Sequence, residues 1–210
     1  MIPVHHPTEA HWLDYVSGQM DGASRILLEA HLAFCAPCRR AAAQDAAPGG
    51  AQLTLAAPEP PPALLQAILG RLGSPTPPRV GTEQLPLPEA LWPLFPDLRR
   101  ARWGSALTRG FRFLEVPLPG TETLYLIHMQ QGRPFPRHGH RGLERSVILR
   151  GGLRDEDSLL EPGDFAEADS SCTHTPVALP DADCWLLASL EGGIRFTGWR
   201  GVLQKLAPEA

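Results

Sequence analysis

The sequence predicts an α+β protein with a helical N-terminal part and an all-β C-terminal part built as an antiparallel barrel or jelly roll. Apolar residues recur at three- and four-residue spacing within residues 1–47, which is the period of an amphipathic helix. From about residue 86 onward, short apolar runs alternate with turns, and no long helical pattern intervenes. Segments rich in proline separate the helical pattern from the strand pattern, so we expect more than one domain.

The composition narrows the class of protein. The chain of 210 residues carries 23 prolines and 20 glycines, which break helices and exclude an all-helical protein. Its formal net charge of −4 argues against nucleic acid as a direct partner. It has neither an apolar run of about 18 residues nor the pattern of a secretory signal, so we expect no membrane span and a cytoplasmic location. In that reducing compartment, the four cysteines would be metal ligands or free thiols rather than disulfides.

Capping residues delimit three helices in the N-terminal part. Thr8 can cap a first helix that Gly18 ends, and Asp21 can cap a second helix. Pro37 suits the first turn of a third helix that runs to about Ala47. The apolar positions of the first two helices are Trp12, Leu13, Tyr15, Val16, Ile26, Leu27, Ala30 and Phe34.

A fourth helix is predicted at residues 63–72, where leucines and an isoleucine form one stripe between proline-rich segments. An isolated helix of about ten residues is marginal in water, so this stripe must pack within its own domain or clasp a partner. We therefore place a helical domain at residues 1–75, with a Pro-rich hinge at about 48–62. A linker at 76–88 and the β domain at 89–205 follow.

The motif His31-x3-Cys35-x2-Cys38 places three metal ligands around a helix junction. His31 and Cys35 lie one helical turn apart and therefore share a face. Zinc takes four ligands in a tetrahedron, and a zinc staple would help a helical unit with little core of its own. The candidates for the fourth ligand are His5, His6 and His11. A redox-active dithiol is the alternative, but the βαβ context of that motif is absent.

A second group of ligands lies in the β part. His138 and His140 point to the same face of an extended strand, and Glu144 can reach the same centre after a glycine irregularity. His174 follows a Pro-Gly turn and begins a strand predicted at residues 175–179. Three imidazoles and one carboxylate suit a divalent first-row metal, and these ligands admit Zn, Fe, Mn, Ni or Cu.

Three further residues have more than one interpretation. Cys172 lies two residues before His174, so it is either a small buried residue or a redox-reactive thiol near the metal. Cys184 alternates with an aromatic residue, which favours a place in the core. His128 lies within a predicted strand, where we expect a histidine with satisfied hydrogen bonds.

The N-terminal pattern resembles the zinc-binding anti-sigma domains of bacteria. An early histidine precedes Leu13-x-Tyr15-x2-Gly18, and the His-x3-Cys-x2-Cys motif follows. The resemblance implies a four-helix domain that sequesters an extracytoplasmic-function sigma factor in a 1:1 complex. It also implies that His6 is the fourth zinc ligand.

The C-terminal pattern resembles the cupin signature. Every fixed position of the first cupin motif is present between Gly132 and Gly151. The second motif keeps its Pro-Gly turn and its histidine, but Ala178 stands where an asparagine is expected. The resemblance implies a cupin domain with a second divalent ion, expected to be zinc. Its ligands would be His138, His140, Glu144 and His174.

Together, the two patterns resemble the ChrR-type anti-sigma factors over nearly the whole chain. The resemblance implies that the cupin domain senses singlet oxygen or organic hydroperoxides and that the sigma factor is then released. No enzymatic activity is expected in this case. The alternative is a cupin-type metalloenzyme, a dioxygenase or isomerase, with a zinc-stabilised interaction domain. A sigma-factor gene next to this one would favour the first interpretation.

Overall fold

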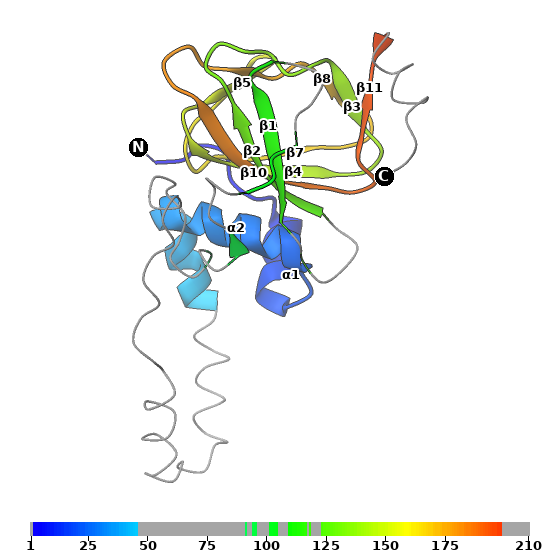
Figure 1. The fold of residues 1–210 in the computed structure, drawn as a ribbon. Helices are drawn as coiled ribbons and strands as arrows, with labels where there is room; N and C mark the ends of the chain where they lie inside the picture. Colours follow the sequence, from blue (N-terminus) through cyan, green and yellow to red (C-terminus); the bar gives the residue numbers. More distant parts are fainter. Residues whose placement is uncertain are drawn as a thin grey trace, which may run out of the picture.

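The computed structural model describes residues 2–45, 91, 94–95, 101–104, 109–116, 118 and 123–198. Within these ranges, a group of helices lies against one side of a β structure (Figure 1). The predicted fourth helix, the Pro-rich hinge and the linker lie outside the described residues.

Helix α1 spans Glu9–Ser17, and the capping residues set its ends as predicted. The side chain of Thr8 accepts a hydrogen bond from the backbone N–H of His11 at 3.4 Å, which satisfies a free amide of the first turn. Gly18 ends the helix with a φ of 73°, a left-handed conformation that glycine adopts without strain.

Helix α2 spans Gly22–Phe34, and Asp21 caps it by accepting from the backbone N–H of Ser24 at 2.9 Å. Residues 36–45 form a further helix after a break at Cys35. The described part of the chain therefore holds three helices where the prediction had four. None of the helices found there combines the length and the apolar character needed to cross a bilayer.

The β part contains eleven strands among the described residues. They are β1 (Phe111–Val116), β2 (Thr123–Met129), β3 (His138–His140), β4 (Glu144–Arg150), β5 (Leu153–Asp155), β6 (Ser158–Leu160), β7 (Phe165–Ala168), β8 (Thr173–His174), β9 (Val177–Ala178), β10 (Cys184–Leu190) and β11 (Ile194–Phe196). All described pairings are antiparallel, as the sequence predicted.

An antiparallel barrel or jelly roll was predicted; the described strands form three sheets and do not close into a barrel. A five-stranded sheet has the order β1-β2-β10-β4-β7, and two three-stranded sheets have the orders β11-β3-β8 and β6-β5-β9. The single strand predicted at residues 175–179 is also wrong, because β8 ends at His174 and β9 begins at Val177. Pro176 lies between them and has no N–H to donate to a ladder, which explains the interruption.

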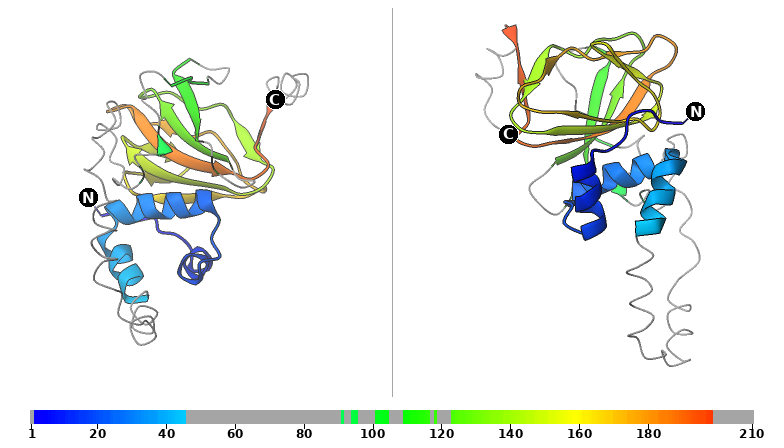
Figure 2. Two further views of the ribbon diagram at one scale, coloured as in Figure 1. Left: turned by 60° about the horizontal axis from the view of Figure 1, so that its bottom comes forward. Right: turned by 180° about the vertical axis from the view of Figure 1, so that it is seen from behind.

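Helix α2 packs directly on the five-stranded sheet. Ala23, Leu27 and Ala30 belong to the same buried cluster as Val147 of β4 and Leu187 of β10. In Figure 2, α2 runs along the sheet, while α1 and the third helix extend away from it. The apolar face of α2 is therefore covered by the β part, so the helices and the sheet share one core.

Candidate metal centres

The N-terminal centre gathers four side chains from three segments. His31 lies near the C-terminal end of α2, Cys35 caps that helix, and Cys38 lies in the first turn of the next helix. His6 comes from the extended segment before α1. One donor atom from each of these four residues lies within 4.8 Å of the others, and the Cys35 and Cys38 sulfurs lie 3.6 and 3.4 Å from His6 Nδ1.

The chemistry of these side chains fits a thiophilic divalent metal. His31 Nδ1 donates to the carbonyl of Gly163 at 2.6 Å, so Nε2 keeps its lone pair. This Nε2 is buried and has no hydrogen-bond partner. Burial lowers the pKa of His31, which keeps the imidazole neutral as ligation requires. Burial, together with a hydrogen bond to Cys35, raises the pKa of Cys38 to about 12. Two adjacent thiolates therefore need a cation beside them.

The structure places His5 and His11 away from this cluster. His5 Nδ1 lies 3.4 Å from Asp164 Oδ2. His11 Nδ1 lies 2.7 Å from Thr8 Oγ1, and its Nε2 accepts from Arg145 Nε at 2.6 Å. Of the three candidates for the fourth ligand, only His6 has a ring nitrogen beside the sulfurs.

A turn of the β part supports the N-terminal centre from outside. The buried carboxylate of Asp164 accepts from the backbone N–H groups of Val4, His5 and Glu161 at 2.8, 3.0 and 2.8 Å. Burial alone would raise the pKa of Asp164, but these hydrogen bonds outweigh it and hold the pKa below its ordinary value. The backbone N–H of Phe165 also donates to the carbonyl of His5 at 3.1 Å.

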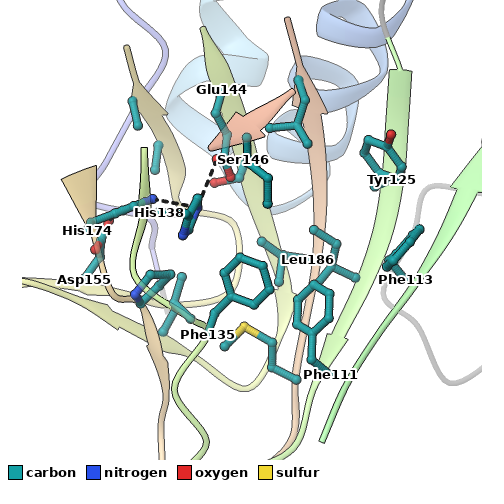
Figure 3. Close-up of a pocket in the computed structure, with 18 of the residues that line it drawn as sticks. Phe111, Phe113, Tyr125, Phe135, His138, Glu144, Ser146, Asp155, His174 and Leu186 are labelled. Atoms are coloured by element: carbon teal, nitrogen blue, oxygen red, sulfur yellow. Dashed lines mark hydrogen bonds and ion pairs between the residues drawn. The ribbon is translucent and has the colours of Figure 1, made fainter. Parts of the chain in front are cut away.

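The second centre lies between two of the sheets. His138 and His140 come from β3, Glu144 begins β4, and His174 ends β8 opposite His138. His174 Nε2 lies 3.2 Å from His138 Nε2 and 3.1 Å from His140 Nε2. Glu144 Oε2 lies 3.0 Å from His140 Nδ1 and 4.0 Å from His138 Nε2. Figure 3 shows His138, Glu144 and His174 pointing toward one another.

The outer contacts of these histidines direct lone pairs into the centre. His138 Nδ1 donates to the carbonyl of Pro136 at 2.9 Å, and His174 Nδ1 donates to Asp155 Oδ2 at 2.6 Å. When both rings are neutral, the two Nε2 atoms face each other with their lone pairs, which is repulsive unless a cation lies between them. Such carboxylate and carbonyl contacts typically orient histidines that bind a metal. The residues present thus fit a divalent ion.

The pKa directions of two histidines differ for physical reasons. Burial lowers the pKa of His140, and Glu144 opposes this only in part. Burial is the largest influence on His174 and acts to lower its pKa. The hydrogen bond to Asp155 and the negative charges of the nearby carboxylates together outweigh burial and raise that pKa. Glu144 Oε2 and His140 Nδ1 are both buried without a hydrogen-bond partner, which further fits a cation beside them.

The remaining residues singled out in the sequence lie outside both centres. Cys184 is completely buried in a core cluster, as predicted. Cys172 is half-buried rather than buried, and burial together with nearby carboxylates raises its pKa. His128 lies 2.9 Å from Asp183 Oδ2 and accepts from Arg112, so the prediction of a satisfied histidine is confirmed.

Sequence reasoning missed the outer contacts. Asp155 and Gly163 contact the candidate ligands His174 and His31, and Asp164 contacts the backbone of His5, next to His6; each contact spans at least 19 residues of the chain. The Pro-Gly-Asp turn was visible in the sequence, but its spacing carries no signal for a contact with residues near the N-terminus.

Comparisons with known proteins agree with this arrangement. A family model described as "ChrR Cupin-like domain" matches residues 97–191, and a zinc-finger family model matches residues 8–39. The anti-sigma-E factor ChrR of Cereibacter sphaeroides is 34% identical over 201 residues, which cover 93% of this chain and 93% of that protein. The crystal structure of Rhodobacter sphaeroides SigE in complex with the anti-sigma ChrR matches with a TM-score of 0.67 and 31% identity. It covers 90% of this chain and all of that one.

The fold and the two sites define a helical zinc-finger unit joined to a cupin-like β structure. Both halves match their families in the same order along the chain. The chain belongs to the ChrR family of anti-sigma factors.

Proposed function

We propose that this protein is an anti-sigma factor that holds an extracytoplasmic-function sigma factor inactive in a cytoplasmic 1:1 complex. The observation that carries this proposal is the match, over 90% of the chain, to an anti-sigma protein solved in complex with its sigma factor. The surface of α1 supports it, because Leu13 and Val16 are 59% and 44% exposed. Two exposed apolar side chains on one helix offer a surface for a partner.

The N-terminal centre is proposed to hold zinc through His6, His31, Cys35 and Cys38. A bound ion would tie the segment before α1 to the junction between α2 and the third helix. The protein contributes two imidazoles and two thiols, one of the thiols buried, to this centre. Cys35→Ala should therefore give constitutive sigma activity, since the partner-binding helices lose this link. A Cys35→Ala protein that stays folded and binds sigma would contradict the proposed role.

The second centre is proposed to hold a divalent ion, zinc in the first place, through His138, His140, Glu144 and His174. We further propose that this centre senses singlet oxygen or organic hydroperoxides and that sensing lowers the affinity for the sigma factor. The packing of α2 on the sheet that includes β4 supports this proposal. Glu144 begins β4, and the next residue, Arg145, donates hydrogen bonds to His11 of α1 and Ser24 of α2.

The test compares sigma binding with and without an oxidant. We expect the double substitution of His138 and His140 by alanine to leave sigma binding intact while abolishing oxidant-stimulated release. Wild-type protein and the exposed-site variant Leu159→Ala serve as controls. Normal release from the double variant would refute the sensing role. Failure of wild-type protein to bind any sigma factor, together with turnover of a small molecule by the metal-loaded protein, would favour the metalloenzyme alternative.

A further inference from the structure

A cavity of about 330 Å³ opens beside the second metal centre. Its walls are mainly aromatic and aliphatic, with Phe111 and Leu186 among the apolar side chains that Figure 3 shows opposite the histidines. His138, Glu144 and His174 form its polar end. The cavity therefore has one polar end and one long apolar wall, a shape that suits an amphipathic small molecule.

The charged side chains around this cavity disfavour binding of a negatively charged ligand. The charged side chains that line its described part are Glu144, Asp155 and Glu167, and no lysine or arginine is among them. A divalent ion at the centre would be neutralised by Glu144 and by Asp155, which binds His174. Glu167 is paired with Arg145 at 3.6 Å. A carboxylate ligand would therefore be desolvated without an unpaired positive charge to stabilise it.

We propose that this cavity binds a neutral molecule with a single oxygen-bearing head and a hydrocarbon body. The head lies at the histidine end, and the body packs against aromatic residues such as Phe111 and Phe135. This inference rests on the proposed sensing role, because such a ligand would occupy the space from which the centre is approached. The cavity would bind such neutral molecules and would not bind carboxylates.

The test uses 1-octanol and octanoate as probes of equal chain length that differ in head-group charge. Binding to the full-length, zinc-loaded protein is measured by ligand-observed NMR and calorimetry. We expect octanol to bind at least about tenfold more tightly than octanoate, a difference of about 1.4 kcal/mol. Octanoate binding as tightly as octanol, or the absence of octanol binding, would overturn the proposal.

A cavity-filling variant locates the probe. Ala166 lines the cavity, so Ala166→Leu should weaken octanol binding at least about tenfold, whereas Ala33→Leu on the exposed face of α2 should not. Unchanged octanol affinity in Ala166→Leu would place the probe elsewhere and overturn the proposal. Sigma binding is measured in parallel without octanol. If the protein binds octanol but no sigma factor, the proposed anti-sigma function is refuted and the proposed ligand class is still supported.

A second, independent observation concerns the turn Glu161–Phe165. This turn contacts both segments that carry N-terminal ligands, since Gly163 accepts from His31 and Asp164 accepts from the backbone of His5, next to His6. The fit is close, because a Cβ on Gly163 would overlap Phe34 and Pro3. Gly163 also has a φ of 94°, which disfavours any other residue.

The same turn is bonded to the strand that carries a ligand of the second centre. Gly163 N–H donates to the carbonyl of Ile148 at 2.8 Å, and Ile148 N–H donates to the carbonyl of Asp164 at 3.2 Å. Ile148 and Glu144 both belong to β4. We infer that this turn is an outer support of the N-terminal metal centre and its direct connection to the β part.

Cobalt substitution tests this inference, because a thiolate-to-cobalt absorption band reports the N-terminal centre alone. Asp164→Asn places an amide N–H against backbone donors, so we expect chelators to remove cobalt from that centre about 10- to 100-fold faster. The matched control is Asp183→Asn, at a turn that contacts Gln131 and His128 instead. Equal cobalt loss from Asp164→Asn and wild-type protein would overturn the inference. If Asp164→Asn does not fold, hydrogen exchange decides: the Val4 and His5 amides of the wild-type protein must be protected, and rapid exchange of both would refute it.

Discussion

Replacing Leu27 with alanine tests whether the helices and the sheet form one cooperative unit. Leu27 is completely buried and lies in the cluster that joins α2 to strands of the five-stranded sheet. Buried Leu→Ala substitutions reduce the free energy of unfolding by about 2–5 kcal/mol, a large part of the roughly 5–15 kcal/mol of a typical domain. We therefore expect a loss of about 3 kcal/mol in the stability of the sheet as well as of the helices.

The assay is urea unfolding of the zinc-loaded protein in a Trp12→Phe background. The tryptophans that remain all follow residue 91 in the sequence, so their fluorescence reports the C-terminal part, while far-UV circular dichroism reports helices and strands together. Both transitions of Leu27→Ala should shift by the same amount. Leu13→Ala, at an exposed position of α1, is the matched control and should shift them by less than about 0.5 kcal/mol. A lower midpoint for the helical signal with an unchanged fluorescence transition would show that the helices unfold alone, and the shared core would be refuted.

Three further predictions follow from local geometry. His6→Ala should lower the zinc content of the purified protein by one equivalent, whereas His5→Ala should keep it; equal zinc loss in both variants, measured by metal analysis, would argue against His6 as the ligand. Burial lowers the pKa of His128, and hydrogen bonds from Gln131 and His128 lower the pKa of Asp183. Each group therefore binds a proton more weakly in the folded protein than in the unfolded chain. Stability should therefore fall as the pH drops below 6.5, the ordinary pKa of histidine, and His128→Gln should flatten the first part of this loss in thermal melts. The Cys184 thiol is fully buried and its pKa is raised to about 12 by burial, so mass spectrometry should find it alkylated after the half-buried Cys172 in the native protein.

Much of the local structure follows from the sequence. Thr8 and Asp21 cap α1 and α2 because their short polar side chains satisfy free amides, and Gly18 ends α1 because it adopts a left-handed conformation. The longer strands follow from apolar runs bounded by turns. These features depend on contacts within a few residues, which spacing can report.

The features that spacing could not report are long-range. The apolar positions of α2 predict a buried face, yet nothing in their period says that a sheet beginning at Phe111 covers it. The same holds for the hydrogen bonds of His174 to Asp155 and of His31 to Gly163, because a single hydrogen bond between distant residues produces no periodic pattern in the sequence. Candidate ligands with a fixed spacing are therefore visible in the sequence, whereas the residues that contact them from outside are not.

Because the sheet covers the apolar face of α2, a partner protein cannot bind there. The spacing of the apolar residues predicts a buried face on each helix without saying what covers it, and the structure shows that the sheet covers the Leu27 face of α2. Among the described helices, α1 retains large exposed apolar side chains, Leu13 and Val16. The opposite side of α1 is anchored by His11, which accepts from Arg145 at 2.6 Å, and Arg145 directly follows Glu144 on β4. A movement of β4 at the second centre would therefore reach α1 through one side-chain contact, without unfolding of the shared core.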